Sequence, residues 1–298
     1  MDTSVAQKAA LHTIGGRLID YGRLIRLHQP TGIWLLGWPA LWGLWLAASG
    51  HPHERTFTVF ILGIVVTRSA GCAINDFADR KVDPYVKRTH DRPLAARRIM
   101  PSEAIVIYLI LSFMAFGLVC LLDRLTIAYA VVGAVLTAVY PFLKRVMSVP
   151  QAWLGLAFSW SVPMAFIAES HAIPPAGWVL FMAGVLWTLV YDTEYAMVDR
   201  DDDRKVGIKS TALLFGEADR LIIGFCQIGV IALLALVGSL LHLGRWYVLG
   251  LVAGSCLFYF QQILLRHRER DACFRAFRNN AWFGAVIFIG IVLDGLFG

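Results

Sequence analysis

The strongest constraint on this chain is a series of long apolar segments that carry almost no charge. Within 298 residues, nine segments can be marked, each of about 17 to 22 residues, close to the length that crosses a hydrocarbon core about 30 Å thick. They cover approximately residues 30–49, 57–76, 103–122, 126–142, 152–168, 176–197, 221–241, 246–265 and 281–297. Because 58% of all residues are also hydrophobic, the sequence indicates a polytopic membrane protein and not two soluble domains.

Backbone groups in a bilayer must be hydrogen-bonded internally, so we predict an all-α fold. Residues 30–298 are expected to form a nine-helix bundle, and residues 1–298 to form a single transmembrane domain. The first 29 residues contain Lys8, Arg17, Arg23 and Arg26 with no apolar core between them. This composition does not fit a cleavable signal peptide. We predict instead a cytoplasmic or interfacial N-terminal segment that contains a helix.

Lysine and arginine residues predict which helix ends face the cytoplasm. When the 27 cations are assigned to successive loops, 23 fall on the side of the N-terminus, three (Arg55, Arg124 and Arg245) on the opposite side and one, Arg68, inside a span. Cytoplasmic loops carry such an excess, so we predict a cytoplasmic N-terminus and an external C-terminus. The net charge of +6 then reflects topology and contact with anionic headgroups. It does not indicate a nucleic-acid partner.

Acidic residues crowd the cytoplasmic end of the second span. The stretch NDFADRKVD begins with Asn75 and contains three aspartates. A helix turns by about 100° per residue, which places four side chains within about a quarter turn: Asn75, Asp76, Asp79 and Asp83. Pro84 disfavours helical continuation, so the position of Asp83 depends on where the helix ends. We predict one acidic face here.

A second acidic face follows the sixth span. Asp192, Asp199 and Asp203 fall within about 40° of one another on a helix, with Tyr195 adjacent and Asp201 on the far side. Like charges stacked on one face are destabilising unless cations lie between them. Ordinary loop charges at a membrane surface are the alternative, but they do not explain two such faces on the same side.

Two facing rows of carboxylates predict a shared site for a divalent cation. Oxygen ligands without His or Cys favour Mg²⁺ over zinc or copper. Mg²⁺ keeps few protein ligands and prefers phosphate oxygens, so a diphosphate is the natural substrate group. The sequence therefore predicts a magnesium-assisted site at the cytoplasmic ends of the second and sixth spans.

Cations are placed where they could contact that diphosphate. Arg68 lies two turns before Asn75 inside an apolar span, where an unpaired guanidinium is costly, so we expect it in the site or paired with an aspartate. Further candidates for substrate binding are Tyr140, Lys144, Arg145, Arg92 and Lys209. For Lys144 and Arg145, a role as topology anchors is an equal alternative. Purely anchoring roles are expected for Lys81, Lys87, Arg88, Arg97 and Arg98.

The motifs resemble those of the UbiA superfamily of intramembrane prenyltransferases. NDFADRKVD is similar to the family's NDxxDxxxD motif, DRDDD at residues 199–203 to its DxxxD motif, and YPFLK at residues 140–144 to its YxxxK element. The stretches DRPLA and YDTEYAMVDRDDD most resemble the branch that prenylates 4-hydroxybenzoate in ubiquinone biosynthesis. The resemblance extends over essentially the whole chain.

The resemblance implies a role for each candidate residue. It implies that Mg²⁺ on the donor diphosphate is held by Asn75, Asp79, Asp199 and Asp203. The residues implied to assist catalysis are Asp76, Asp83 and Asp192, and either Asp192 or Tyr195 would orient the acceptor phenol. Lys144, Arg145 and Arg68 would neutralise the leaving group. Asp201 and Asp202 lie between the two motif aspartates, Asp199 and Asp203, and are alternative ligands.

The resemblance also implies where the reaction takes place and which substrates it uses. The expected fold has nine helices around a central cavity, with the active site on the cytoplasmic side of a bacterial inner membrane and the C-terminus in the periplasm. The expected partners are membrane lipid, a polyprenyl diphosphate and 4-hydroxybenzoate. Alternative acceptors are a naphthoate, homogentisate or haem, and a cation-coupled transporter is a less favoured alternative from another class. The sequence specifies no oligomeric state.

Overall fold

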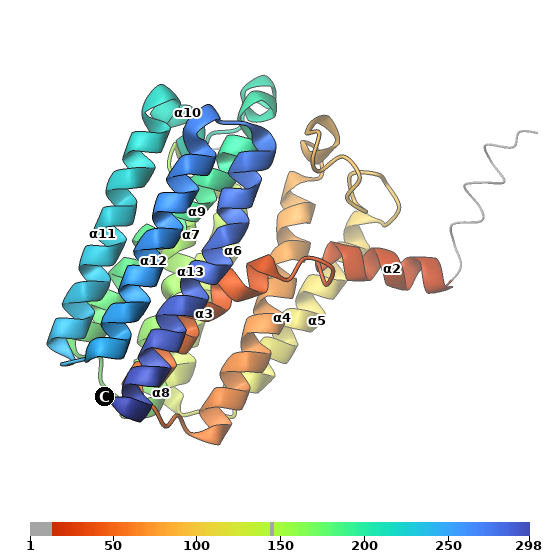
Figure 1. Cartoon of the computed structure of the whole chain (residues 1–298). Helices are drawn as coiled ribbons and strands as arrows, with labels where there is room; N and C mark the ends of the chain where they lie inside the picture. Colours follow the sequence, from red (N-terminus) through yellow and green to blue (C-terminus); the bar gives the residue numbers. More distant parts are fainter. Residues whose placement is uncertain (1–13, 144–145) are drawn as a thin grey trace, which may run out of the picture.

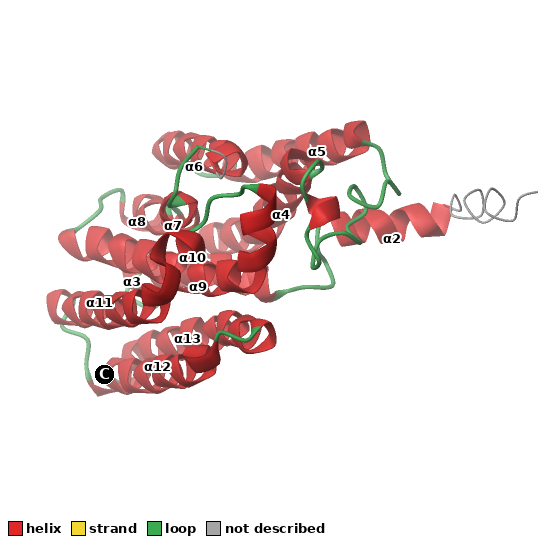
Figure 2. Cartoon of the chain, turned by 90° about the horizontal axis from the view of Figure 1, so that it is seen from above, coloured by secondary structure: helices red, strands yellow, loops and turns green. Residues whose placement is uncertain are grey.

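The computed structural model describes residues 14–143 and 146–298. All regular structure in these residues is helical, as Figures 1 and 2 show. The α-helices are α2 (Ile14–Leu24), α3 (Thr31–Ala47), α4 (Glu54–Asp79), α5 (Pro101–Val119), α6 (Arg124–Leu143), α7 (Pro150–Ser159), α8 (Ser161–Ser170), α9 (Pro175–Val206), α10 (Thr211–Phe215), α11 (Asp219–Leu240), α12 (Arg245–Leu264) and α13 (Arg270–Phe297). Short 3₁₀ helices are η2 (Asp83–Tyr85), η3 (Gly216–Ala218) and η4 (Leu265–His267).

The predicted polytopic all-α fold is confirmed. Among the described residues, eight helical segments are long and apolar enough to cross a membrane, with α7 and α8 counted together. Helix α3, with 17 residues, lies at the short end of that range. Each of the nine predicted spans falls on one of these segments.

Two predicted boundaries differ clearly from the structure. Helix α9 continues to Val206, where Gly207 ends it in a left-handed conformation with φ +74°. Helix α13 begins at Arg270 and not near residue 281. The early part of α13 carries several charges, so hydropathy misses it, although Ala272, Cys273 and Ala276 are buried. Hydropathy finds the part of a helix that lies in hydrocarbon, not the whole helix.

The fifth predicted span is interrupted at Trp160. Helix α7 ends at Ser159 and α8 begins at Ser161. Pro163 has no N–H to donate to the carbonyl of Ser159, so the regular hydrogen-bond series cannot continue through this point. A proline that the sequence places inside an apolar run thus divides one span into two short helices.

Helices α3, α9 and α13 meet at the core of the bundle. Seen from above, α9 lies inside the bundle, with α5 and α6 toward one edge and α12 toward the other (Figure 2). The rings of Trp42 and Trp187 lie 5.1 Å apart, and those of Trp187 and Phe283 lie 5.4 Å apart. All three side chains are fully buried. Helix α9, which carries the second acidic motif, therefore stands in a rigid aromatic environment.

Buried hydrogen bonds fix α9 against α13 below the site. Asn280 accepts a bond from Trp187 Nε1 at 2.8 Å and donates one to Glu194 Oε2 at 2.8 Å. All three residues are fully buried. A polar group in such surroundings needs its partner, because leaving it unpaired costs more than the bond itself contributes.

Asn280→Ala is expected to destabilise the protein by about 1–3 kcal/mol, because it leaves the Trp187 N–H and the Glu194 carboxyl without their partner. Thermal unfolding in detergent micelles measures the loss. Glu194→Gln serves as the control, because its side-chain oxygen can still accept the bond from Asn280. Equal melting temperatures for wild type and Asn280→Ala would contradict this account of the core.

Candidate active site

A cavity of about 1110 Å³ lies between α4, α9 and the loops at one end of the bundle. Both predicted acidic faces line it. The predicted site residues that line it are Arg68, Asn75, Asp79, Asp83, Arg92, Tyr140, Asp192, Tyr195, Asp199, Asp203 and Lys209. Asp76, Asp201 and Asp202 do not line it, and Lys144 and Arg145 lie outside the described residues.

The acidic face of α4 is shorter than predicted. Within it, Asn75 Nδ2 donates to Asp79 Oδ2 at 3.1 Å, one turn along the helix. The helix ends at Asp79, and Asp83 reaches the cavity from the 3₁₀ turn Asp83–Tyr85. The prediction that Asp83 continues the helical stripe is wrong, because Pro84 follows it and a new turn begins. Burial raises the pKa of the Asp83 carboxyl, and Arg92 opposes that rise.

Asp76 does not line the cavity, but it pairs with two arginines, Arg26 and Arg92, that do. Its side chain is 1% exposed and lies 2.5 Å from Arg26 Nη2 and 3.1 Å from Arg92 Nη1. Arg92 Nη1 also donates to Asp83 Oδ2 at 2.9 Å. These contacts favour an anchoring role for Asp76, not the assisting role in catalysis that the motif implies.

Arg88 is paired with the acidic face of α9. Its Nη2 lies 2.5 Å from Asp199 Oδ2, and its Nε lies 3.1 Å from both carboxylate oxygens. Its guanidinium also stacks over the Tyr195 ring, 4.4 Å from the centroid. The expectation that Arg88 is only a membrane anchor is therefore wrong.

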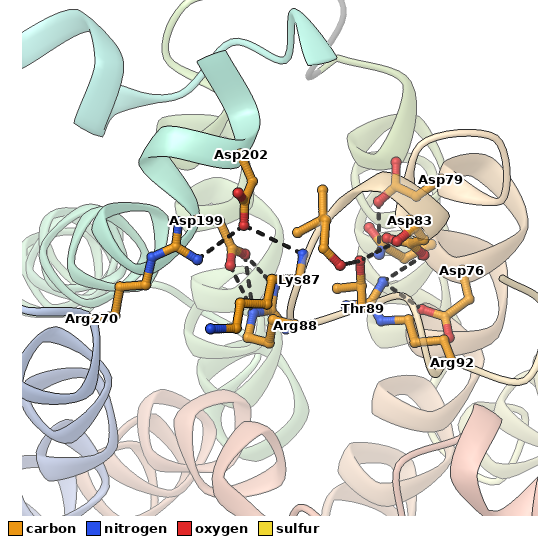
Figure 3. Close-up of polar contacts among 12 residues, drawn as sticks. Asp76, Asp79, Asp83, Lys87, Arg88, Thr89, Arg92, Asp199, Asp202 and Arg270 are labelled. Atoms are coloured by element: carbon orange, nitrogen blue, oxygen red, sulfur yellow. Dashed lines mark hydrogen bonds and ion pairs between the residues drawn. The ribbon is translucent and has the colours of Figure 1, made fainter. Parts of the chain in front are cut away.

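The bridging loop, residues 80–100, connects the two acidic faces. In Figure 3 its segment with Lys87, Arg88 and Thr89 runs from the side of Asp79 and Asp83 toward Asp199 and Asp202. At the far side, the Lys87 backbone N–H donates to Asp202 Oδ2 at 3.4 Å. At its end Arg98, also expected to be an anchor, donates to Asp20 of α2 at 2.9 Å. The loop thus inserts cations between two rows of like charge, as their mutual repulsion requires.

Arg68 reaches the cavity through a space that a glycine leaves open. A Cβ atom at Gly32 of α3 would collide with the guanidinium of Arg68. Arg68 Nη1 also lies 2.9 Å from Cys72 Sγ, which Arg26 contacts at 3.9 Å. Arg26 lines the same cavity, although the sequence did not single it out. An acidic face inside a membrane protein implies that compensating cations exist, but not which ones.

An aromatic wall borders the cavity beside the α9 carboxylates. The rings of Tyr195 and Phe277 lie 4.6 Å apart, and those of Phe274 and Phe277 lie 5.9 Å apart. Tyr191 joins them, with its ring 6.3 Å from Phe277. Such faces can contact an apolar chain and stabilise a positive charge next to it.

The donor set fits a magnesium ion that shares its coordination with a substrate. Carboxylates of α4 and α9 line the same cavity, and His28, from the segment before α3, also lines it. Among residues 14–143 and 146–298, no three His, Cys, Asp or Glu side chains are grouped closely enough to form a complete metal site. Mg²⁺ typically takes one or two carboxylates together with water and phosphate oxygens, and does not need such a protein cage.

The fold and the paired acidic motifs define an intramembrane prenyltransferase. The chain belongs to the UbiA prenyltransferase family, whose model matches residues 36–287. It is 55% identical over 286 residues to the 4-hydroxybenzoate octaprenyltransferase of Chromohalobacter salexigens, with 96% of each chain covered. It is 51% identical over 278 residues to that of Alkalilimnicola ehrlichii, with 93% of this chain and 95% of the relative covered.

Solved structures of more distant relatives share the fold. A UbiA homologue from Aeropyrum pernix K1 superposes with a TM-score of 0.77 at 23% identity, covering 88% of this chain and 97% of its own. A UbiA homologue from Archaeoglobus fulgidus bound to GPP and Mg²⁺ superposes with a TM-score of 0.68 at 18% identity, covering 91% and 99%. The predicted family and its helical membrane fold are thereby confirmed.

Arg92→Gln is expected to loosen the bridging loop, because it removes the cation that pairs with both Asp76 and Asp83. Breaking a buried ion pair costs about 3–5 kcal/mol, and even about 1.4 kcal/mol speeds local opening about tenfold. Amide hydrogen exchange of residues 81–99, followed by mass spectrometry, measures the change. Arg97→Gln is the control, because Arg97 is an exposed cation of the same loop. Unchanged exchange in Arg92→Gln would show that the loop is held by other contacts.

Proposed function

We propose that this protein transfers a polyprenyl group from a polyprenyl diphosphate to the carbon ortho to the hydroxyl, C3, of 4-hydroxybenzoate, in ubiquinone biosynthesis. The close relatives are named as octaprenyltransferases, so the proposed donor carries an octaprenyl chain. The observation that carries the proposal is the single cavity lined by Asp79 of α4 and by Asp199 and Asp203 of α9.

The membrane setting suits a substrate with two unlike parts. The donor has a charged diphosphate and a long apolar chain. The cavity is lined by carboxylates and arginines, which suit the diphosphate, and by an aromatic wall, which suits the apolar chain. The excess of cations at this end of the helices supports a cytoplasmic position, with the N-terminus inside a bacterial inner membrane and the C-terminus in the periplasm.

The two acidic rows would hold Mg²⁺ on the diphosphate through Asn75, Asp79, Asp199 and Asp203. The bound ion supplies charge neutralisation that lowers the barrier to loss of the diphosphate. Arg68 and Lys209 line the same cavity and would bind the phosphate oxygens as charge develops on them. Lys144 and Arg145 are assigned to the same task on the basis of the sequence motif alone.

Bond formation follows ionisation. The allylic carbon–oxygen bond breaks, and both electrons leave with the diphosphate. The resulting allylic cation would be stabilised by aromatic faces such as those of Phe274 and Phe277, which line the cavity. The ring carbon ortho to the phenol oxygen attacks the cation and forms the new carbon–carbon bond, and loss of the ring proton restores aromaticity. Asp192 and Tyr195 both line the cavity, and either one would orient the phenol.

Asp79→Ala and Asp203→Ala are each expected to abolish turnover, because each removes a carboxylate from one of the two metal-binding rows. The variants should remain folded in membranes. Asp201→Ala is the matched control, because the Asp201 side chain is 70% exposed and lies outside the cavity lining. Product formation from a labelled donor measures the effect, and near-normal rates in Asp79→Ala or Asp203→Ala would refute the metal assignment.

Product mass identifies the acceptor and the need for metal. The purified protein is incubated with octaprenyl diphosphate and one acceptor at a time, with either Mg²⁺ or a chelator. We expect prenylated 4-hydroxybenzoate only with Mg²⁺, and no product from a naphthoate, homogentisate or haem. Exclusive turnover of one of those other acceptors would contradict the proposed substrate while leaving the reaction type intact.

A further inference from the structure

Asp219 is a fully buried carboxylate outside the cavity that binds two arginines from other elements. It is the first residue of α11 and has 0% of its side chain exposed. It forms an ion pair with Arg200 of α9, and Arg268 Nε donates to its Oδ1 at 3.0 Å. Asp219 does not line the cavity. We call Asp219, Arg200 and Arg268 the α9 clamp.

Stability alone does not account for the α9 clamp. Moving a carboxylate and guanidinium groups out of water is expensive, and a buried ion pair often contributes no more stability than apolar side chains of the same size. In some proteins such a pair instead fixes one conformation. The question is therefore which part of the protein the clamp holds in place.

Arg200 lies inside the second acidic motif. With Asp199 placed at 0°, Asp203 falls at about 40°, Arg200 at about 100° and Asp202 at about −60° around the helix. Around the helix, Asp199 and Asp203, which line the cavity, therefore lie between Arg200 and Asp202, and each of these two has an ion-pair partner on another helix. On one side Arg200 is held by Asp219, and on the other Asp202 is held by Arg270 Nη1 at 3.0 Å.

The two ion pairs lie on opposite sides of α9, and α9 supplies the cation in one and the anion in the other. A cation of α9 is held by an anion of α11, and an anion of α9 is held by a cation of α13. A rotation of the helix end by one residue position, about 100°, would break both attachments. The same end carries four aspartates within five residues, whose repulsion favours unwinding when no cation opposes it.

We infer that Asp219, acting through Arg200, is a positioning residue that sets the rotation of the last turns of α9 and so directs Asp199 and Asp203 into the cavity. The inference rests on the proposed function, because it concerns the binding of Mg²⁺ and diphosphate by these two aspartates. Arg268 supports Asp219 from the turn before α13. None of the three residues of the α9 clamp touches substrate in this scheme.

The test compares Asp219→Asn with Asp294→Asn. Asp294 is also a buried aspartate that binds helix-end N–H groups, with Gly244 N at 2.7 Å, but it lies near the C-terminus of α13. The Mg²⁺ concentration for half-maximal turnover should rise about tenfold or more in Asp219→Asn, the usual scale when a group that orients a metal ligand is lost. It should be unchanged in Asp294→Asn. Arg268→Gln, a milder change in the same clamp, should give a smaller rise.

A second readout does not depend on turnover. Mg²⁺ with inorganic pyrophosphate should raise the melting temperature of the wild type and of Asp294→Asn, and this rise should be reduced in Asp219→Asn. If Asp219 acts through Arg200, the effects of the two substitutions should not add. The double variant Arg200→Met/Asp219→Asn should then lose no more of the rise in melting temperature than the single variant with the larger loss.

The outcomes separate the inference from the proposed function. Suppose that the wild type responds to Mg²⁺, and that Asp219→Asn and Arg268→Gln both show the wild-type Mg²⁺ concentration for half-maximal turnover and the wild-type rise in melting temperature. The α9 clamp is then only structural, and the inference is overturned. Additive effects in the double variant would overturn the route through Arg200. If the wild type forms no product in the presence of Mg²⁺, the proposed function fails and the inference fails with it.

Discussion

The site depends on the interleaving of arginines with two rows of carboxylates at the edge of a membrane. Neither row is stable alone, because like charges on one helical face repel and burial removes the water that would screen them. Arg88 at Asp199 and Arg92 between Asp76 and Asp83 supply the opposing charge from one loop. The same contacts therefore hold the bridging loop in place and oppose the repulsion between carboxylates on both helices.

Hydropathy predicts the membrane helices well because the bilayer imposes one length on every span. Each of the nine predicted segments falls on a helical segment of the described chain. Helical spacing likewise places Asp199 and Asp203 on one face, since α9 remains regular through both residues. These successes share a cause: within one regular helix, position in the sequence determines position in space.

The failures occur where that regularity ends. Asp83 leaves the predicted stripe because α4 stops at Asp79. Arg88 meets Asp199 across 111 residues of sequence, and Arg26 meets Asp76 across 50. A pattern of neighbouring residues cannot predict contacts between residues so far apart in the sequence. Charge balance shows that cations must approach the carboxylates, but only the path of the bridging loop determines that Arg88 pairs with Asp199 and Arg92 with Asp76.

The helices of the bundle differ in how much of their apolar surface the protein itself buries. Around α9, 61% of the apolar stretch is buried in protein, whereas for α5, which packs on α4, the figure is 11%. Helix α6 is equally exposed. On the other side of α9, α11 and α12 have 33% of their apolar stretches buried, so α5 and α6 are the helices that the protein covers least. Because α5 packs on α4, lipid that contacts α5 lies only one helix away from the carboxylates of α4.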